Sequence, residues 1–543
     1  MANVERDLAH KIIEHTHTNL FLTGRAGTGK TTFLRQLREQ SHKRMVVLAP
    51  TGIAAINAGG VTIHSFLQLP FGMYIPGSQF GKEQFRFSNR KRKLIRSLDL
   101  IVIDEISMVR ADLLDCMDAA LRRIRIDARP FGGVQLLMIG DLQQLPPVVR
   151  DEDRETLHKY YESEFFFSSQ ALKRTPFITI ELQKVYRQTD QDFLELLNAV
   201  RDNRADDNTL QRLNTRYRPN FKASGSTYVR LVTHNHQADH INAHEMKQLT
   251  TSEHQFRAVV EGTFPESSYP AAEVLTLKRG AQVMFIKNDS SAEHRYFNGL
   301  LGEITEISEK YVVVRPQDSS DEISVGVETW QNSRFTLNEK TNEIEEVVDG
   351  TFKQIPLRLA WAITVHKSQG LTFERAIIDV QSAFSHGQAY VALSRCKTLE
   401  GMVLSAPIPR EAIIQDVSVV QFSHAMAEQV PNETEVAAME RNYFFGLMTE
   451  LFDFGQLLIL FDALLRLLQE HFYKRIPATL QDCQNQRLLL QQKMVAVALK
   501  FRPQFETLIA LHDDYATNEH LAERVEKGAR YFLTEVKAMQ HFM

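Results

Sequence analysis

Short apolar runs alternate with segments of helical spacing over the first part of the chain. The runs are rich in Leu, Ile and Val and are bounded by turn residues: Leu20–Thr23, Met45–Ala49, Leu100–Ile103 and Val134–Ile139. Strands that are apolar along their whole length are typical of parallel sheets, because helices cover both faces of such a sheet. The pattern therefore predicts an α/β fold built on a parallel sheet.

The pattern changes twice further along the chain. From about Arg279 to Phe352, short runs with strand-like alternation are separated by turns, which favours a small β-barrel insertion. Beyond Pro409 the strand pattern ends and amphipathic stretches follow, so residues 426–543 are predicted to be all-helical. A tetratricopeptide-like array is conceivable there, but the sequence shows no internal period.

Composition limits the class of protein. A chain of 543 residues suggests three or four domains, and 63 Lys and Arg against 67 Asp and Glu give a net charge of −4, so any basic surface must be local. The three cysteines lie far apart, which argues against disulfides and structural zinc. The nearly apolar stretch Phe454–Leu468 is interrupted by Asp462 and Arg466, and the N-terminus lacks a signal-peptide core. We expect a soluble, intracellular protein without a membrane partner, in the cytoplasm or nucleoid of a prokaryote or the nucleus or mitochondrion of a eukaryote.

The clearest chemical signal is Gly24–Thr32, which follows an apolar run and precedes helical spacing. It matches G-x-x-x-x-G-K-[ST], the loop whose backbone N–H groups close around phosphates. We expect Lys30 between the β- and γ-phosphates of a nucleotide and the Thr31 hydroxyl on Mg²⁺. The predicted nucleotide-binding residues of this loop are Gly24, Ala26, Gly27, Thr28, Gly29, Lys30, Thr31 and Thr32. A chance glycine-rich turn is disfavoured, because motif and context agree.

Two further strand ends carry candidate chemistry. The run Leu100–Ile103 leads into Asp104 and Glu105. This pair suits a Walker B site in which Asp104 holds Mg²⁺ through water and Glu105 polarises the attacking water, with a solvated loop as the alternative. The last run leads into Gly140–Val148, which would place Gln144 near the γ-phosphate, as a sensor of hydrolysis, if the sheet has the usual topology.

The stretch Ala49–Phe66 leaves a strand with small residues and hydroxyls, so it can approach a nucleic-acid backbone. We expect its polar side chains to bond phosphates or sugars and Phe66 to stack on a base, as in proteins that grip a single strand without reading its sequence. The polar candidates are Thr51, Thr62, His64 and Ser65. A packed turn with Phe66 in the core is the alternative.

Two other stretches leave their role open. The basic run Asn89–Lys93 suits a DNA contact and a solvated helix face equally well, and a nuclear-import signal is a third possibility. His236, His240 and His244 recur at a spacing that shares one helix face, which would suit a metal ion. No acidic or cysteine ligand is fixed beside them, so we interpret the stretch as a turn into a helix.

Together these motifs resemble those of the Pif-type (petite integration frequency) DNA helicases, RecD-like members of superfamily 1. The stretches similar to motifs I, Ia/Ib, II and III are Gly24–Thr32, Ala49–Phe66, Ile101–Met108 and Gly140–Val148. Those similar to motifs IV, V and VI are Leu182–Gln188, Ala362–Val380 and Ala389–Leu404. Ala111–Arg125 resembles the segment that separates the Pif type from its RecD relatives. The resemblance covers about residues 18–406.

The resemblance implies two RecA-like domains with ATP between them. The first would span residues 1–170, with a small wedge insertion at about 69–96, and the second residues 171–278 and 353–425. The β-barrel insertion would then be residues 279–352, and residues 426–543 a helical accessory domain.

The resemblance also assigns roles in the second domain. Arg187 and Arg395 would be arginine fingers that neutralise charge on the transferring phosphate. Gln369 and Gly370 would lie at the nucleotide cleft, where Gln369 couples it to DNA. The DNA-backbone candidates, for each of which a local cap or turn is the alternative, are Thr364, His366 and Ser368. The family's adenine-recognition glutamine is absent before the phosphate loop, and Asn3 is a candidate substitute.

The activity implied by the resemblance is an ATP- and Mg²⁺-dependent DNA helicase that moves 5′→3′ on single-stranded DNA and unwinds tailed duplexes. Its setting would be DNA repair, recombination or telomere maintenance. The alternatives are an ATPase switch that clamps a strand without unwinding it, an RNA helicase, and a subunit of a helicase–nuclease complex. The C-terminal helical region is a candidate site for a protein partner.

Overall fold

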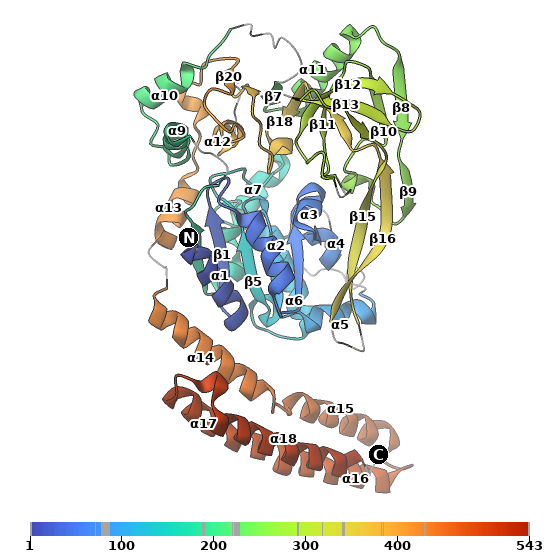
Figure 1. Cartoon of the computed structure of the whole chain (residues 1–543). Coiled ribbons are helices and arrows are strands. Elements are labelled where there is room, and N and C mark those ends of the chain that lie inside the picture. The colour runs from blue at the N-terminus through green and yellow to red at the C-terminus, as the bar shows by residue number, and fades with distance from the viewer. Residues whose placement is uncertain are drawn as a thin grey trace. The chain divides into compact units, whose positions relative to one another are not determined.

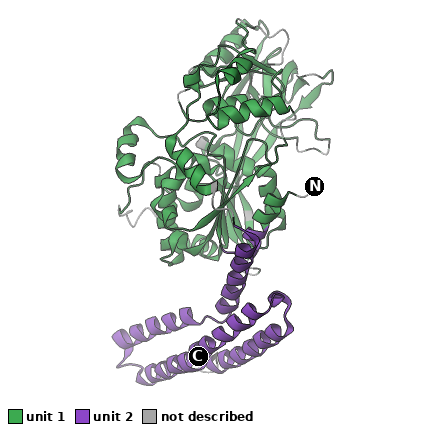
Figure 2. Cartoon of the chain, turned by 90° about the vertical axis from the view of Figure 1, so that its left-hand side faces the viewer, with its two compact units in different colours: residues 1–10, 18–430 green, residues 11–17, 431–543 purple. Residues whose placement is uncertain are grey.

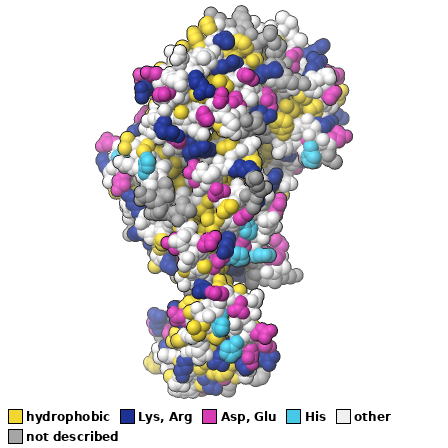
Figure 3. All heavy atoms as spheres, turned by 60° about the vertical axis from the view of Figure 1, so that its left-hand side comes forward, with side chains coloured by type: hydrophobic (Ala, Val, Ile, Leu, Met, Phe, Trp, Pro, Cys, Tyr) yellow, Lys and Arg dark blue, Asp and Glu magenta, His cyan; other side chains and the backbone are white. Residues whose placement is uncertain are grey.

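The structure is a computed structural model, and it describes residues 3–70, 72–77, 87–186, 190–219, 221, 228–289, 291, 293–317, 319–338, 341, 343–381, 383, 385–427 and 431–540. The chain divides into two compact units (Figure 2). Unit 1 comprises residues 1–10 and 18–430, and unit 2 comprises residues 11–17 and 431–543. On the face drawn in Figure 3, Lys and Arg side chains are interspersed with Asp and Glu rather than gathered into one patch.

A six-stranded parallel sheet organises the first part of unit 1 (Figure 1). In spatial order its strands are β3 (Val61–Thr62), β2 (Met45–Ala49), β4 (Leu100–Ile103), β5 (Gln135–Ile139), β1 (Asn19–Gly24) and β6 (Phe177–Leu182). Every residue of β4 and β5 is buried, as expected for strands covered on both faces. The predicted α/β fold with a parallel sheet is confirmed.

The helices of this part are α1 (Val4–His15), α2 (Lys30–Gln40), α3 (Gly52–Ala58), α4 (Ile63–Leu67), α5 (Asn89–Ser97), α6 (Ala111–Arg125), α7 (Asp151–Tyr160) and α8 (Gln170–Lys173). The strand β6 lies beyond residue 170 yet pairs with β1 along its whole length. The domain boundary predicted at residue 170 is therefore too early. An apolar run does not reveal which of two sheets it will join.

Buried carboxylates on α6 tie this helix to its surroundings. Asp115 accepts hydrogen bonds from the Tyr161 hydroxyl at 2.9 Å, the Ser169 hydroxyl at 2.5 Å and the Ala171 N–H at 2.9 Å. Asp112 accepts one from the Tyr74 N–H at 2.9 Å. A buried charge is tolerated only when such partners replace water. Asp112 and Asp115 therefore help to pack α6 against its neighbours.

A second parallel sheet follows in the chain. Its strands, in spatial order, are β18 (Ala362–Thr364), β7 (Val229–Val232), β19 (Ala376–Ile378) and β20 (Met402–Leu404). The helices that accompany it are α9 (Gln191–Arg201), α10 (Asp207–Asn214), α11 (Asn235–Gln248) and α12 (Gln388–Leu393). The helix α13 (Val417–Ala427) follows in the chain but packs on the first sheet, where it contacts β6 and its Val419 lies in that sheet's core. The second sheet packs into its own core around Leu231, Ile363 and Val391.

The insertion between β7 and β18 is an assembly of antiparallel sheets. A five-stranded sheet has the order β14 (Ile323–Val325), β13 (Val312–Pro316), β12 (Leu301–Ile307), β11 (Gln282–Phe285) and β17 (Leu357–Leu359). The hairpin β15 (Glu328–Leu337) and β16 (Ile344–Gln354) pairs with β9 (Val259–Gly262), and β8 (Glu253–Arg257) pairs with β10 (Val274–Lys278).

These strands correct the prediction for residues 279–352. Among the described strand pairs, none joins β14 to β17, so the five-stranded sheet is open and the predicted barrel is not confirmed. The insertion also begins earlier and ends later than predicted, from β8 to β17. Alternation along a strand predicts a half-buried sheet but not whether its two edges meet.

The predicted wedge at residues 69–96 is described in part, because residues 71 and 78–86 lie outside the described residues. Its basic run forms α5, where the Ser88 hydroxyl accepts the Lys91 N–H at the helix start. The Lys91 ammonium lies 3.9 Å from the centre of the Phe66 ring. Burial, together with the nearby Arg334, lowers the pKa of Lys91 to about 8.

Unit 2 is helical throughout its described residues after 430, as predicted. Its helices are α14 (Glu433–Glu450), α15 (Gly455–Phe472), α16 (Pro477–Leu489), α17 (Ala496–Leu511) and α18 (Glu519–Gln540), and a π-helical turn, Leu490–Val495, joins α16 to α17. Phe452, Phe461 and Phe505 form part of its core. In the part of the chain that the structure describes, no helix is long and apolar enough to cross a membrane.

Candidate nucleotide site and nucleic-acid contacts

The loop Gly24–Thr32 joins the end of β1 to the start of α2, the strand-turn-helix setting that its motif requires. Gly24 has φ +152°, and a Cβ there would lie 2.7 Å from the Thr28 hydroxyl and 2.8 Å from the Leu182 carbonyl oxygen. Gly29 has φ +89° at the position before α2. Side chains at these two positions would therefore disrupt the loop.

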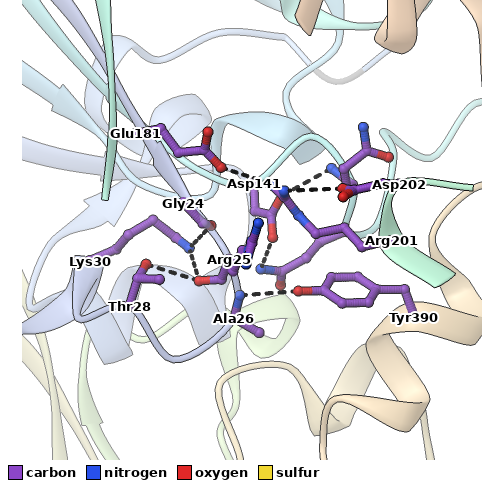
Figure 4. A network of polar contacts seen from close by, with 12 residues as sticks. Gly24, Arg25, Ala26, Thr28, Lys30, Asp141, Glu181, Arg201, Asp202 and Tyr390 are labelled. Atoms are coloured by element: carbon purple, nitrogen blue, oxygen red, sulfur yellow. Dashed lines mark hydrogen bonds and ion pairs between the residues drawn. The ribbon is translucent and has the colours of Figure 1, made fainter. Parts of the chain in front are cut away.

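Lys30 lies inside the loop (Figure 4). Its ammonium donates to the Gly24 carbonyl at 2.6 Å and to the Arg25 carbonyl at 3.1 Å, and the Thr28 hydroxyl donates to the same Arg25 oxygen at 2.9 Å. Thr31 and Thr32 are exposed in the first turn of α2. An ammonium at a helix N-terminus with exposed hydroxyls beside it is the donor set that a nucleoside triphosphate needs.

The predicted acid pair lies at the end of β4. Glu105 has φ +53°, a left-handed conformation that is uncommon for a residue with a side chain. Burial raises the pKa of Asp104, and burial together with the charge of Asp104 raises the pKa of Glu105, while Lys30 opposes both shifts. The pKa of Glu105 therefore lies closer to neutrality than that of a free glutamate, which is the shift that a general base requires.

Gln369 reaches this acid pair from the second sheet. Its side-chain N–H donates to Glu105 Oε2 at 2.9 Å, although the two residues lie 264 positions apart in the chain. The neighbouring Gly370 has φ +80°. Gln369 therefore joins the acid pair of one sheet to the segment after β18 of the other. Its predicted role in coupling the nucleotide cleft to DNA stays a prediction.

Gln144 lies in the loop after β5 and is 6% exposed. Its amide donates to Asp141 Oδ2 at 3.1 Å, and Asp141 pairs with Arg201 at 3.4 Å (Figure 4). Burial alone would raise the pKa of Asp141, but Arg201, Lys30 and the hydrogen bond from Gln144 outweigh it, so this pKa lies below its ordinary value. The charged Asp141 carboxylate therefore holds the Gln144 side chain in place.

Arg201 was missed by sequence reasoning. It lies at the end of α9, and besides Asp141 it contacts Glu181 at 3.4 Å and Asp202 at 3.5 Å. An arginine in the last turn of an amphipathic helix is common, because the helix dipole stabilises a positive charge at the C-terminal end of any helix. The residue therefore gives no sign of a special role in the sequence. Its partners become visible only when β5, β6 and α9 are brought together.

Two tyrosines beside the phosphate loop were also missed. The Tyr390 hydroxyl accepts the Ala26 N–H at 3.3 Å, and the Tyr186 N–H donates to the Gly27 carbonyl at 2.8 Å. The Tyr186 side chain is 56% exposed, and its hydroxyl lies 3.5 Å from the Asn3 amide. The signal for Tyr186 was its position directly before Arg187 in the motif IV stretch.

The two predicted arginine fingers have different outcomes. Arg187 lies outside the described residues. Arg395 is 1% exposed, and its guanidinium donates to the carbonyls of Val391 at 2.9 Å and Leu371 at 3.3 Å within its own domain. The charge of Arg395 nevertheless acts on Glu105, where it opposes the rise in the pKa of that carboxyl.

Of the predicted DNA contacts of Ala49–Phe66, two are helix caps, one is a core residue, and His64 and Ser65 are half-buried and exposed, respectively. The hydroxyls of Thr51 and Thr62 accept N–H groups at the starts of α3 and α4, both at 3.2 Å. Ser65 is exposed, and burial lowers the pKa of the half-buried His64. Phe66 is 1% exposed, so the prediction that it stacks on a base is wrong.

Phe66→Ala is therefore expected to destabilise the protein rather than weaken DNA binding selectively. Removing a buried phenylalanine costs about 3–5 kcal/mol. The free energy of unfolding in urea measures this loss, and fluorescence anisotropy with an oligonucleotide measures affinity. Ser65→Ala, at the exposed neighbouring position, is the control and should change stability little. A stable Phe66→Ala protein with weakened DNA binding would restore the stacking hypothesis.

The predicted contacts in motif V mostly bond locally. Thr364 is 3% exposed, and its hydroxyl accepts the Lys367 N–H at 3.4 Å. Ser368 is fully buried and donates to the Val365 carbonyl at 2.7 Å. Burial lowers the pKa of His366, which keeps its ring neutral. For Thr364 and Ser368 the structure supports the cap-and-turn alternative.

The two predicted Mg²⁺ ligands, Asp104 and Thr31, lie at the end of β4 and in the first turn of α2. Within the described ranges, no group of three His, Cys, Asp or Glu side chains is arranged to hold a metal ion, which includes the stretch with His236, His240 and His244. The charge of Lys30 acts on Asp104 at the end of β4 and lowers its pKa against the effect of burial. Thr31, which follows Lys30 in the chain, is exposed. A carboxylate and a hydroxyl next to bound phosphates fit Mg²⁺, which prefers oxygen ligands and retains several waters.

Sequence comparison identifies relatives of both units. A sequence model of PIF1-like helicases matches residues 2–211, and a model of a DNA helicase middle domain matches residues 435–543. The ATP-dependent DNA helicase PIF1 of Homo sapiens is 32% identical over 440 residues, which are 78% of this chain and 65% of the human protein. The chain thus spans less than two thirds of the human relative. The ATP-dependent DNA helicase Pif1 of Bdellovibrio bacteriovorus is 33% identical over 411 residues, 74% of this chain and 88% of that protein.

Solved structures give the same relationship. The crystal structure of a Bacteroides sp Pif1 in complex with ADP-AlF4 has a TM-score of 0.73 at 42% identity and covers 78% of this chain and 96% of its own. Bacteroides Pif1 bound to single-stranded DNA has a TM-score of 0.58 at 42% identity and covers 79% of this chain and 98% of its own.

Proposed function

This chain belongs to the PIF1-like helicase family, and from that premise we propose that it is an ATP-dependent DNA helicase acting on single-stranded DNA and tailed duplexes. The observation that carries the proposal is the hydrogen bond from Gln369 to Glu105, because it joins the catalytic acid of the first sheet to the second. The two parallel sheets would be RecA-like domains whose closure over ATP moves them along one strand.

The residues of the first domain would act in sequence on the nucleotide. Lys30 and the loop N–H groups would hold the phosphates, and Thr31 and Asp104 would hold Mg²⁺, which withdraws charge from the transferring phosphate. Glu105 would take a proton from the attacking water. Gln144, held by Asp141, would report the state of the γ-phosphate to the second domain through Arg201.

Tyr186 and Asn3 are proposed to receive the base of the nucleotide. The Tyr186 ring is exposed next to the phosphate loop, and an exposed aromatic face there can stack on a purine. The Asn3 amide near its hydroxyl supplies both a donor and an acceptor for the base edge. This pair would replace the glutamine that the sequence lacks.

Unwinding assays with tailed duplexes test the proposal. We expect strand separation of a duplex with a 5′ single-stranded tail, dependent on ATP and Mg²⁺, and little separation with a 3′ tail. One base-pair step holds about 1.4 kcal/mol of stacking, so ATP hydrolysis can drive it. A blunt duplex is the matched control substrate. Unwinding of only the 3′-tailed duplex would contradict the proposed direction.

The ATPase switch remains the second candidate, since the same site would drive it. DNA-stimulated hydrolysis without separation of any tailed duplex would favour the switch. The helical unit 2, whose residues 435–543 match the helicase middle domain, is proposed as an accessory region that a protein partner could bind.

A further inference from the structure

His386 connects the loop that carries Gln144 to the second sheet's domain. It lies two residues before α12, and its side chain is 6% exposed. Its Nε2 lies 2.8 Å from the Leu142 carbonyl oxygen, and its Nδ1 lies 3.1 Å from the Asp416 nitrogen, just before α13. The His386 ring thus contacts both the loop after β5 in the first sheet and the segment that follows β20 of the second sheet.

These two bonds assign the tautomer of the ring. A backbone nitrogen can only donate, so Nδ1 of His386 must accept the Asp416 N–H and carries no proton. The single proton is then on Nε2, which donates to the Leu142 carbonyl. Burial lowers the pKa of His386, which keeps the ring neutral, although the hydrogen bond to the Leu142 carbonyl, the charges of Asp416 and Asp141 and a backbone hydrogen bond to Ile414 act in the opposite sense. Arg201 and Tyr390 line the same small cavity.

The neighbouring backbone packs on the same loop. Gly387 has φ +73°, and a Cβ there would lie 2.3 Å from the Gln144 carbonyl oxygen and 2.6 Å from that of Gln143. The Gln415 amide donates to the Gln143 side chain at 3.4 Å. The loop Asp141–Gln144 is therefore held by its own Asp141, which bonds Gln144, and by contacts with residues 386–387 and 415 from elsewhere in the chain.

We propose that His386 is a positioning residue for ATP hydrolysis, whose Nε2–H group holds the Leu142 carbonyl so that Gln144 keeps its place at the γ-phosphate. This inference rests on the proposed function. Donation from Nε2 to Leu142 sets the loop, and acceptance at Nδ1 links the loop to the start of α13. A substitution that removes the Nε2–H donor should free the loop, whereas one that retains a donor at this position should hold the loop in place.

Two amides separate the functions of the two nitrogens. His386→Gln can present a donor near the position of Nε2, and His386→Asn an acceptor near that of Nδ1. We expect His386→Asn and His386→Ala to lower kcat for ATP hydrolysis with a saturating oligothymidylate about fivefold, the value of one hydrogen bond of about 1 kcal/mol. The KM for ATP should stay within about twofold, because the phosphate loop is unchanged. His386→Gln should keep kcat within about twofold of the unsubstituted protein.

His294→Ala is the control, because His294 lies in the insertion, where its Nδ1 is 3.3 Å from the Asp289 carbonyl oxygen. Equal kcat losses in all three His386 variants, or better activity in His386→Asn than in His386→Gln, would overturn the inference. A lowered melting temperature together with lost ADP affinity would assign the ring to folding and also overturn it. If the unsubstituted protein shows no DNA-stimulated hydrolysis, the proposed function itself fails.

Discussion

Lys30→Ala is expected to abolish ATP hydrolysis, with a loss on the order of a thousandfold or more, comparable to the loss of other cations that contact the transferring phosphate. The ammonium lies 2.6 Å and 3.1 Å from two loop carbonyls, so it is already placed within the phosphate loop. Its charge also acts on Asp104, Glu105 and Asp141. Without it, phosphates would enter a site in which these three carboxylates have lost a nearby positive charge.

Phosphate release with saturating single-stranded DNA measures this effect, and titration with a fluorescent ADP measures nucleotide affinity. Lys159→Ala is the control, because Lys159 is an exposed residue paired with Glu155 on α7. Lys30→Arg should recover little activity, since a planar guanidinium does not replace a compact ammonium in a tight loop. Hydrolysis by Lys30→Ala at a rate close to that of the unsubstituted protein would disprove the loop assignment.

Glu105→Gln is expected to lower kcat by about 10²–10⁴, the usual contribution of a general base. Affinity for ATP should persist, because the substitution keeps the shape of the side chain and an oxygen that can accept from Gln369. Single-turnover hydrolysis and nucleotide titration separate the two effects. Glu155→Gln, on the exposed surface of α7, is the matched control. Near-normal hydrolysis by Glu105→Gln would show that another group accepts the proton.

The pH dependence follows from the raised pKa of Glu105. A base must be ionised to accept a proton, so kcat should fall as the pH is lowered through this pKa. Because burial and Asp104 raise the pKa, the fall should begin closer to neutrality than for a free glutamate. The residual activity of Glu105→Gln should lack this acidic limb. An unchanged limb in that variant would assign it to another group.

The sequence determined those parts of the protein that depend on interactions between residues near one another in the chain. The phosphate loop was predictable because a strand, a turn of glycines and a helix start must follow one another directly, and the first parallel sheet was predictable because fully buried strands must be apolar throughout. The helical character of the region after residue 430 was predictable from the spacing of its apolar residues, because this spacing depends only on the local geometry of a helix.

Tertiary structure decided whatever depends on contacts between distant segments. Phe66 carries the same side chain whether it lies in a core or on a surface, and only the packing around α4 and α5 buries it. The open five-stranded sheet differs from a barrel only in whether β14 and β17 meet. Arg201, Tyr390 and His386 acquire partners only when the loops after β1 and β5 approach the second sheet's domain, because such hydrogen bonds join residues far apart in the chain, where sequence spacing carries no information.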